Sequence, residues 1–111
     1  MVYIFNELQE CVKDDFDSFY NDVDFKDHQY IIPALLNEYE RAEGYNMTDE
    51  TCVYLYLLEN YINNGLDSME LKSIVKEKAK QNIDFIKKDL GEEDFKKFQQ
   101  DYFKIVDGII I

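Results

Sequence analysis

The sequence predicts an all-α fold, a compact bundle of about five helices around a buried central helix at about residues 49–63. One proline and four glycines among 111 residues are too few for the turns of a fold with many strands. The stretch from Thr51 to Ile62 is apolar on nearly every side of a helix, which is typical of a helix that is buried all round. Each glycine follows a predicted helix, where helix ends favour this residue. We expect residues 1–111 to form a single helical domain.

The first helix is expected from Asn6 to about Tyr20, with Asn6 as its N-cap. Asparagine is favoured at this position because its side-chain oxygen accepts a hydrogen bond from the first turn. Apolar residues at helical spacing give the helix a buried side, and the opposite ridge is acidic. This ridge is either an ordinary solvated surface or one side of an acidic docking surface. Its acidic residues are Glu10, Asp14 and Asp17.

The second helix is expected to begin at His28 or at Ile32 and to end near Glu43. Pro33 then lies in the first turn, where proline is best tolerated, or it marks a kink. Gly44 follows the helix as a natural C-terminal glycine. The helix is therefore expected to connect to the central helix through a short loop.

The third helix is the one expected at the centre of the bundle. Thr48 is its predicted N-cap, and Asp49 and Glu50 lie in the first turn, where the helix dipole favours acidic residues. Met47 is expected to pack on Cys52 across this first turn. Tyrosines of this helix can be core residues, or they can form the edge of an interface.

Two further helices are expected after the central one. Asp67 is the predicted N-cap of the fourth helix, with Glu70 three residues later as in a capping box, and Gly91 ends this helix. The fifth is expected from about Glu92 to Val106. The tail Ile109–Ile111 is too apolar to remain in water, so we expect it to pack on the domain or on a partner.

The charge of the chain is high and unevenly distributed. There are 24 acidic and 12 basic residues, which gives a net charge of −12. Residues 1–50 carry 13 acidic and 3 basic residues, whereas residues 51–111 carry 11 and 9. Nucleic acids and anionic membranes are not expected as partners, because binding them requires clustered lysine and arginine. The charge favours solubility, a basic partner, or both.

No catalytic or metal-binding motif is present in the sequence. The aspartates of residues 22–27 do not match a calcium loop, because Lys26 and Pro33 occupy two of the ligand positions. The single histidine has no partner at a known spacing, and Cys11 and Cys52 are expected to be buried thiols. We therefore expect no enzyme activity and no cofactor. Without a signal peptide or a membrane-spanning segment, the chain is expected to be cytoplasmic.

By size, acidity, helical content and cytoplasmic character, the whole chain resembles the immunity proteins of bacterial toxin systems, such as colicin and contact-dependent growth inhibition systems. The resemblance is one of type. It implies a toxin inhibitor that neutralises one cognate basic toxin domain, with a nuclease as the expected target. Nucleases need basic clefts to hold phosphate, and an acidic helical surface can fill such a cleft. Alone, the protein is expected to be a monomer or a weak dimer.

The expected partner-binding residues are the exposed acids of the first half, together with an aromatic anchor. An anti-defence protein of a phage or mobile element that mimics DNA would use the same surface. A helical scaffold or oligomer subunit would use the acids only for solubility. The expected contact residues are Glu10, Asp14, Asp17, Asp22, Asp24, Asp27, Glu38 and Glu40, with Tyr20, Phe25 or Tyr45 as the anchor.

Overall fold

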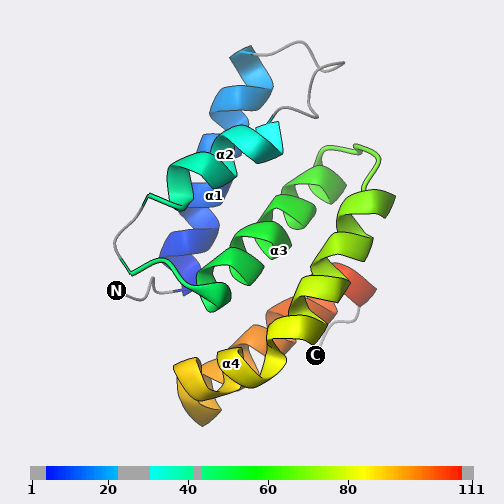
Figure 1. The fold of residues 1–111 in the computed structure, drawn as a ribbon. Coiled ribbons are helices and arrows are strands. Elements are labelled where there is room, and N and C mark those ends of the chain that lie inside the picture. Colours follow the sequence, from blue (N-terminus) through cyan, green and yellow to red (C-terminus); the bar gives the residue numbers. More distant parts are fainter. Residues whose placement is uncertain (1–4, 23–30, 42–43, 109–111) are drawn as a thin grey trace.

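A computed structural model describes residues 5–22, 31–41 and 44–108 of the chain (Figure 1). Most of the described residues are helical and none lies in a strand, so the all-α prediction is confirmed. Predictions for Asp24, Phe25, Asp27, His28 and the tail Ile109–Ile111 lie outside these ranges. The elements are α1 (Phe5–Asp22), α2 (Ile31–Tyr39), α3 (Met47–Asn63), α4 (Met69–Tyr102) and the π-helical turn η2 (Phe103–Asp107).

The helix count differs from the prediction because α4 includes both of the last two predicted helices. Gly91 has a non-helical backbone, with φ 80° and ψ 175°, so α4 bends there and the chain turns back (Figure 1). We call residues 69–90 the outgoing arm and residues 92–102 the returning arm. The break that the glycine predicted is present, but as a sharp kink within one element. A residue with a Cβ atom rarely adopts this backbone conformation.

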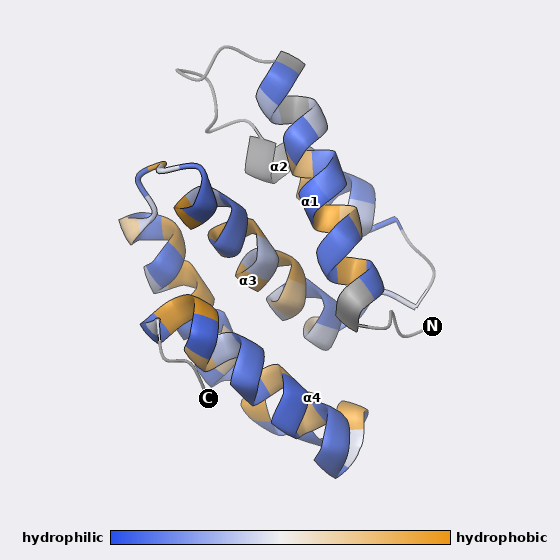
Figure 2. Ribbon diagram, turned by 180° about the vertical axis from the view of Figure 1, so that it is seen from behind, coloured by the Kyte–Doolittle hydropathy of each residue, from blue (hydrophilic) through white to orange (hydrophobic). Residues whose placement is uncertain are grey.

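Helix α3 is in contact with α1, α2, α4 and η2. In both ribbon views it lies between α1 and α4 (Figures 1 and 2). Successive helical residues point about 100° apart, so a buried run covers all sides of the helix. Residues 55–58 form such a run. Buried apolar residues recur at helical spacing between polar ones along α1 and α4, as in amphipathic helices (Figure 2). The core residues of α3 are Cys52, Val53, Leu55, Tyr56, Leu57, Leu58 and Tyr61.

Three predicted N-caps, Asn6, Thr48 and Asp67, are wrong. Helix α1 begins at Phe5, so Asn6 lies inside its first turn. Helix α3 is capped by Asn46, whose side-chain oxygen accepts a hydrogen bond of 3.1 Å from the backbone N–H of Asp49. The Asp49 carboxylate in turn accepts a 3.1 Å hydrogen bond from the backbone N–H of Asn46. These two hydrogen bonds form a reciprocal capping box. Thr48, the predicted cap, is instead a buried residue in the first turn of α3.

The starts of the other helices are close to those predicted. Pro33 lies in the first turn of α2, but this helix ends at Tyr39, earlier than the predicted Glu43. Helix α4 begins at Met69 with Ser68 as its N-cap. Asp67, the predicted cap, still accepts a hydrogen bond of 3.2 Å from the backbone N–H of Met69.

A buried polar cluster joins α3 to the returning arm of α4. The Tyr56 hydroxyl donates a 3.0 Å hydrogen bond to the Asp101 carboxylate, and Lys97 donates one of 2.8 Å to the same group. Tyr56 is fully buried, and only 8% of Asp101 is exposed. A buried carboxylate is costly unless it is hydrogen-bonded and paired, and both conditions are met here. The cluster fixes the position of the returning arm against the central helix.

A second polar cluster joins α3 to the outgoing arm. Lys78 forms an ion pair with Glu50, and its ammonium group lies 4.7 Å from the centre of the Tyr54 ring. A cation at this distance from an aromatic face is attracted by the ring. Both arms of α4 are therefore held to α3 by polar contacts as well as by the apolar core.

Candidate functional site

Helix α1 presents a row of exposed carboxylates. Glu7, Glu10 and Asp14 are exposed and lie three or four residues apart, which places them on one side of the helix. We call these three residues the α1 acidic face. Lys13 is the one basic residue of α1, and it pairs with Asp17 at 3.1 Å. In the described part of the chain, no ion pair neutralises the three carboxylates of the face.

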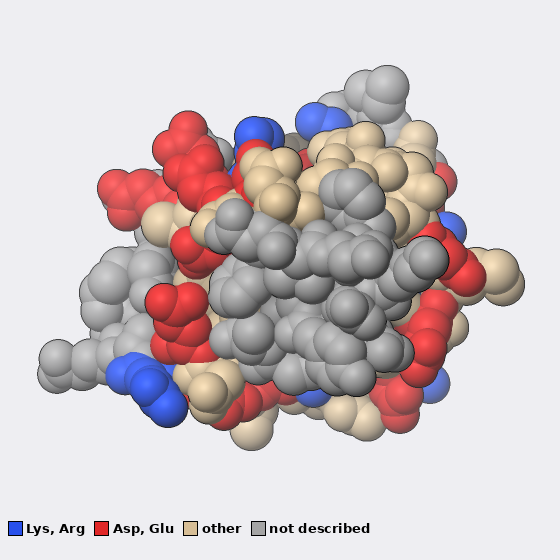
Figure 3. All heavy atoms as spheres, turned by 90° about the horizontal axis from the view of Figure 1, so that it is seen from above, with Lys and Arg blue, Asp and Glu red and all other residues tan. Residues whose placement is uncertain are grey.

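Predicted contact residues of α2 lie in the same half of the molecule. Glu38 is exposed on α2 and Glu40 is exposed in the turn that follows. Helix α2 packs on α1, and the Tyr39 hydroxyl donates a 2.7 Å hydrogen bond to Asp15. In the view from above, acidic side chains outweigh basic ones on the described surface (Figure 3). Asp22 is the last residue of α1, and its side chain lies outside the description.

Tyr20 and Tyr45, the two predicted anchors that the structure describes, pack inward. Tyr20 is half-buried against the core, and its ring stacks on Phe16 with the centroids 5.5 Å apart. Tyr45 is also half-buried, and its hydroxyl is enclosed without a hydrogen-bond partner among the described residues. Burial, followed by the nearby carboxylates of Glu50 and Glu40, raises the pKa of the Tyr45 hydroxyl. Tyr20 and Tyr45 are therefore only partly accessible to a partner.

A hollow of about 310 Å³ lies beside the acidic face, between α1 and α3. We call it the acidic hollow, and it is lined by Gln9, Glu10, Lys13 and Glu59. The Gln9 amide donates a 2.7 Å hydrogen bond to Glu59, which holds that carboxylate at the edge of α1. The hollow combines two carboxylates with one ammonium group. A lysine or arginine side chain from another protein is the complementary group for such a set.

Sequence reasoning missed Glu59 because it lies inside the apolar stretch of the central helix. Glu59 is the only charged residue between Thr51 and Ile62. A single charge in an otherwise buried helix was the available signal, since a charge of this kind must reach the surface or be paired.

Cys11 is exposed beside the α1 acidic face, contrary to the prediction of a buried thiol, whereas Cys52 is buried as predicted. Partial desolvation, followed by the carboxylates of Asp15 and Asp14, raises the pKa of the Cys11 thiol. Because the thiolate is the nucleophile, this environment disfavours reaction at Cys11.

A comparison with protein-family models gives no match, and comparisons with curated proteins and with solved structures give none either. Within the described ranges, no three His, Cys, Asp or Glu side chains are grouped so as to hold a metal ion. None of the described helices has both the length and the apolar character needed to cross a membrane.

Proposed function

We propose that this protein binds a basic protein through the α1 acidic face and thereby neutralises it, as an immunity protein neutralises a toxin. The proposal rests on the division of charge along the chain. Residues 1–68 contain 15 acidic and 3 basic residues, whereas residues 69–111 contain nine of each. The whole net charge of −12 therefore belongs to the half that contains α1, α2 and α3.

Charge on one side of a molecule steers a partner of opposite charge toward that side. Steering of this kind raises association rates to about 10⁸–10⁹ M⁻¹ s⁻¹ at low salt. Speed is useful to an inhibitor, since it has to capture its target before the target acts. After the encounter, one basic side chain of the partner would bind in the acidic hollow, between the carboxylates of Glu10 and Glu59.

The proposed target is a nuclease domain that acts on RNA or DNA. Such a domain needs a basic cleft to hold phosphate groups, and the carboxylates of α1 would replace those groups. A DNA-binding target of a phage or mobile-element protein would present a similar basic surface. The two targets differ in what the partner does, so the partner's activity separates them.

The proposal is tested by capture on the immobilised protein, followed by elution with a salt gradient. The test variant carries Glu7→Gln, Glu10→Gln and Asp14→Asn. A matched control carries Glu92→Gln, Glu93→Gln and Asp94→Asn, which remove the same charge from three exposed residues of the returning arm. We expect the wild type and the control to capture a basic protein and to inhibit its nuclease activity, and the test variant to do neither.

Equal capture by the two variants would show that the α1 acidic face is ordinary surface. Capture of a DNA-binding protein without nuclease activity would favour the DNA mimic. Recovery of only the protein itself would favour a scaffold or oligomer subunit.

A further inference from the structure

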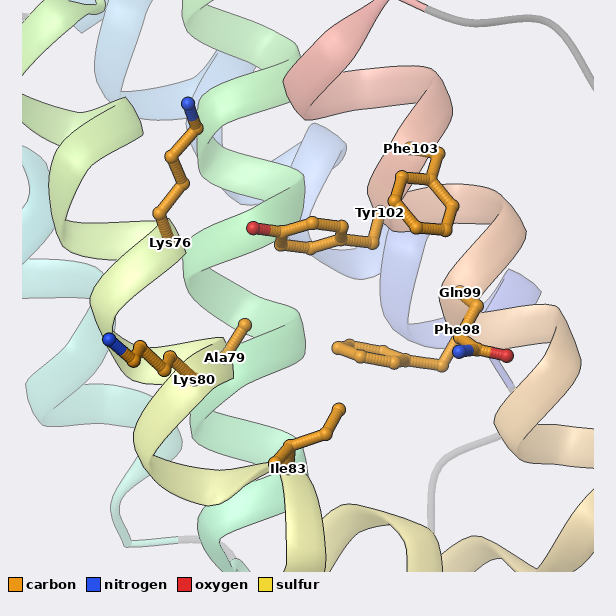
Figure 4. Close-up of a pocket in the computed structure, with 8 residues that line it drawn as sticks. All are labelled: Lys76, Ala79, Lys80, Ile83, Phe98, Gln99, Tyr102 and Phe103. Atoms are coloured by element: carbon orange, nitrogen blue, oxygen red, sulfur yellow. The ribbon is translucent and has the colours of Figure 1, made fainter.

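The two arms of α4 enclose an apolar groove on the other side of α3 from the acidic face. The groove has a volume of about 320 Å³, at the lower end of the range of ligand sites. We call it the α4 groove. The rings of Phe98 and Tyr102 point from the returning arm toward the outgoing arm, opposite Ala79 and Ile83 (Figure 4). Its lining residues are Lys76, Ala79, Lys80, Ile83, Phe98, Gln99, Tyr102 and Phe103.

Apolar surface remains open to water at the edges of this groove. Ile83 and Phe103 are each 37% exposed, although the floor residues Ala79 and Phe98 are buried. Surface of this kind gains free energy when an apolar group covers it. The groove is therefore suited to an apolar chain of limited size.

Two lysines define one edge of the groove. Lys76 and Lys80 are one helical turn apart on the outgoing arm, and their ammonium groups point away from the rings (Figure 4). Their alkyl stems line the groove while their charges stay in solvent. In the described part of the chain, neither has a carboxylate within 4.0 Å, in contrast to Lys78, which pairs with Glu50. Both ammonium groups are available to an anion.

A second hollow borders the same two lysines, and all the residues that line it are of polar or charged types. It is lined by Ser73, Lys76, Glu77, Lys80 and Gln81. Lys76 and Lys80 thus lie between the apolar groove and a hollow that carries polar and charged groups, an arrangement that suits an amphipathic anion. Glu77, which accepts a 3.3 Å hydrogen bond from Gln81, would repel a doubly charged head group more strongly than a singly charged one.

We propose that the α4 groove binds a single-chain carboxylate amphiphile, a fatty acid, with its chain between the two arms and its carboxylate at Lys76 and Lys80. The groove is too small for a lipid with two chains. Residues 69–111 have no net charge, so the local charge does not repel an anion. The acidic face lies on the opposite side of α3 (Figure 1), and salt screens charge beyond about 10 Å. This site does not depend on the proposed function of α1.

Titration with dodecanoate below its micelle concentration tests the proposal. Methyl NMR signals of Ala79 and Ile83 report the groove, and calorimetry gives the affinity. We expect saturable shifts of these signals with dodecanoate and weaker binding of the uncharged dodecan-1-ol. Equal or tighter binding of dodecyltrimethylammonium would overturn the assignment of an anion site.

Two variants examine the two ends of the ligand. Lys76→Glu with Lys80→Glu should weaken dodecanoate binding about tenfold, as expected from the loss of two partly exposed ion pairs. The matched control, Lys87→Glu with Lys88→Glu, changes two exposed lysines outside the groove and should bind as the wild type does. Ile83→Ser should weaken dodecanoate and dodecan-1-ol alike, because it removes part of the apolar wall at a half-open position.

Three results would refute the fatty-acid site. These are the absence of saturable shifts at Ala79 and Ile83, equal weakening by the two lysine variants, and shifts confined to α1. Signals of the groove that change with protein concentration alone would assign it to a second copy of the chain instead. Far-UV circular dichroism of each variant establishes that the fold is retained.

Discussion

Replacement of Tyr56 by phenylalanine tests the buried contact between α3 and the returning arm. The change removes only the hydroxyl that donates to Asp101 at 3.0 Å. Asp101 keeps its ion pair with Lys97, so its charge is still compensated. The loss of a hydrogen bond to a charged group costs about 1.5–2 kcal/mol, and we expect this decrease in the free energy of unfolding at neutral pH.

The cost of Tyr56→Phe should also depend on pH. Burial, followed by the Cys52 thiol and the Asp101 carboxylate, raises the pKa of the Tyr56 hydroxyl above its ordinary value. In the unfolded chain this hydroxyl ionises near pH 10, while the native state keeps the proton. The unfolded state then binds fewer protons than the native state, so stability falls as the pH rises through and beyond about 10. At about pH 11, Tyr56 should account for a loss of about 1.4 kcal/mol.

Phenylalanine has no ionisable hydroxyl, so the variant does not lose this part of the unfolding free energy at alkaline pH. The difference in unfolding free energy between the wild type and Tyr56→Phe should shrink by about 1.4 kcal/mol between neutral pH and about pH 11. Urea unfolding followed by circular dichroism at both pH values measures it. Leu57→Ala is the control, because it removes no titrating group and its cost should not follow this pattern. If the unfolding free energies of the wild type and Tyr56→Phe differ by the same amount at both pH values, the burial of the Tyr56 hydroxyl is refuted.

Four further changes test the fold itself. Gly91→Ala should destabilise the protein by about 1–3 kcal/mol in urea unfolding, because φ 80° with ψ 175° is a conformation for glycine, and an unchanged midpoint would contradict the kink. Leu57→Ala in the fully buried run should cost about 2–5 kcal/mol. Ile62→Ala on the exposed side of the same helix should cost under about 0.5 kcal/mol, and similar thermal shifts of these two variants would contradict the placement of α3. Asn46→Ala should cost about 1 kcal/mol through the loss of the capping box, and no change in thermal midpoint would show that the cap is dispensable.

The buried run of α3 was predictable because it depends on local composition. Residues that are apolar in every direction around a helix can only be accommodated inside the domain. The break at Gly91 was predictable for a similar reason, since the backbone conformation there requires glycine. Sequence could not show that the two arms fold back on each other around this residue.

The cap of α3 was predicted two residues late because Asn46 and Thr48 are both good N-cap residues. The residue three positions after Asn46 is Asp49, which can return a hydrogen bond, whereas Thr51 follows Thr48 at that spacing. The hydrogen bond that Asp49 returns to the backbone of Asn46 therefore makes Asn46 the cap. Comparing the residues three positions after Asn46 and after Thr48 would have identified it.

The surfaces were less predictable than the helices. Glu10 and Asp14 of the α1 acidic face were found from helical spacing alone, whereas Glu7 was not among the predicted residues. The acidic hollow was not found, because Glu59 comes from another helix 50 residues from Gln9. In the same way, the α4 groove joins Ala79 and Ile83 to residues of the returning arm that are distant in sequence. Contacts between distant segments depend on tertiary packing, which a pattern within one helix does not specify.

The division of charge between the two halves also gives the protein an electric dipole. Near a positively charged surface, the resulting torque turns α1 toward the charge and α4 away from it. Adsorption on a cationic support should therefore produce an oriented layer in which the α4 groove faces the solution. A partner bound at the proposed α1 site would likewise leave the α4 groove open, so the two proposals together predict simultaneous occupancy.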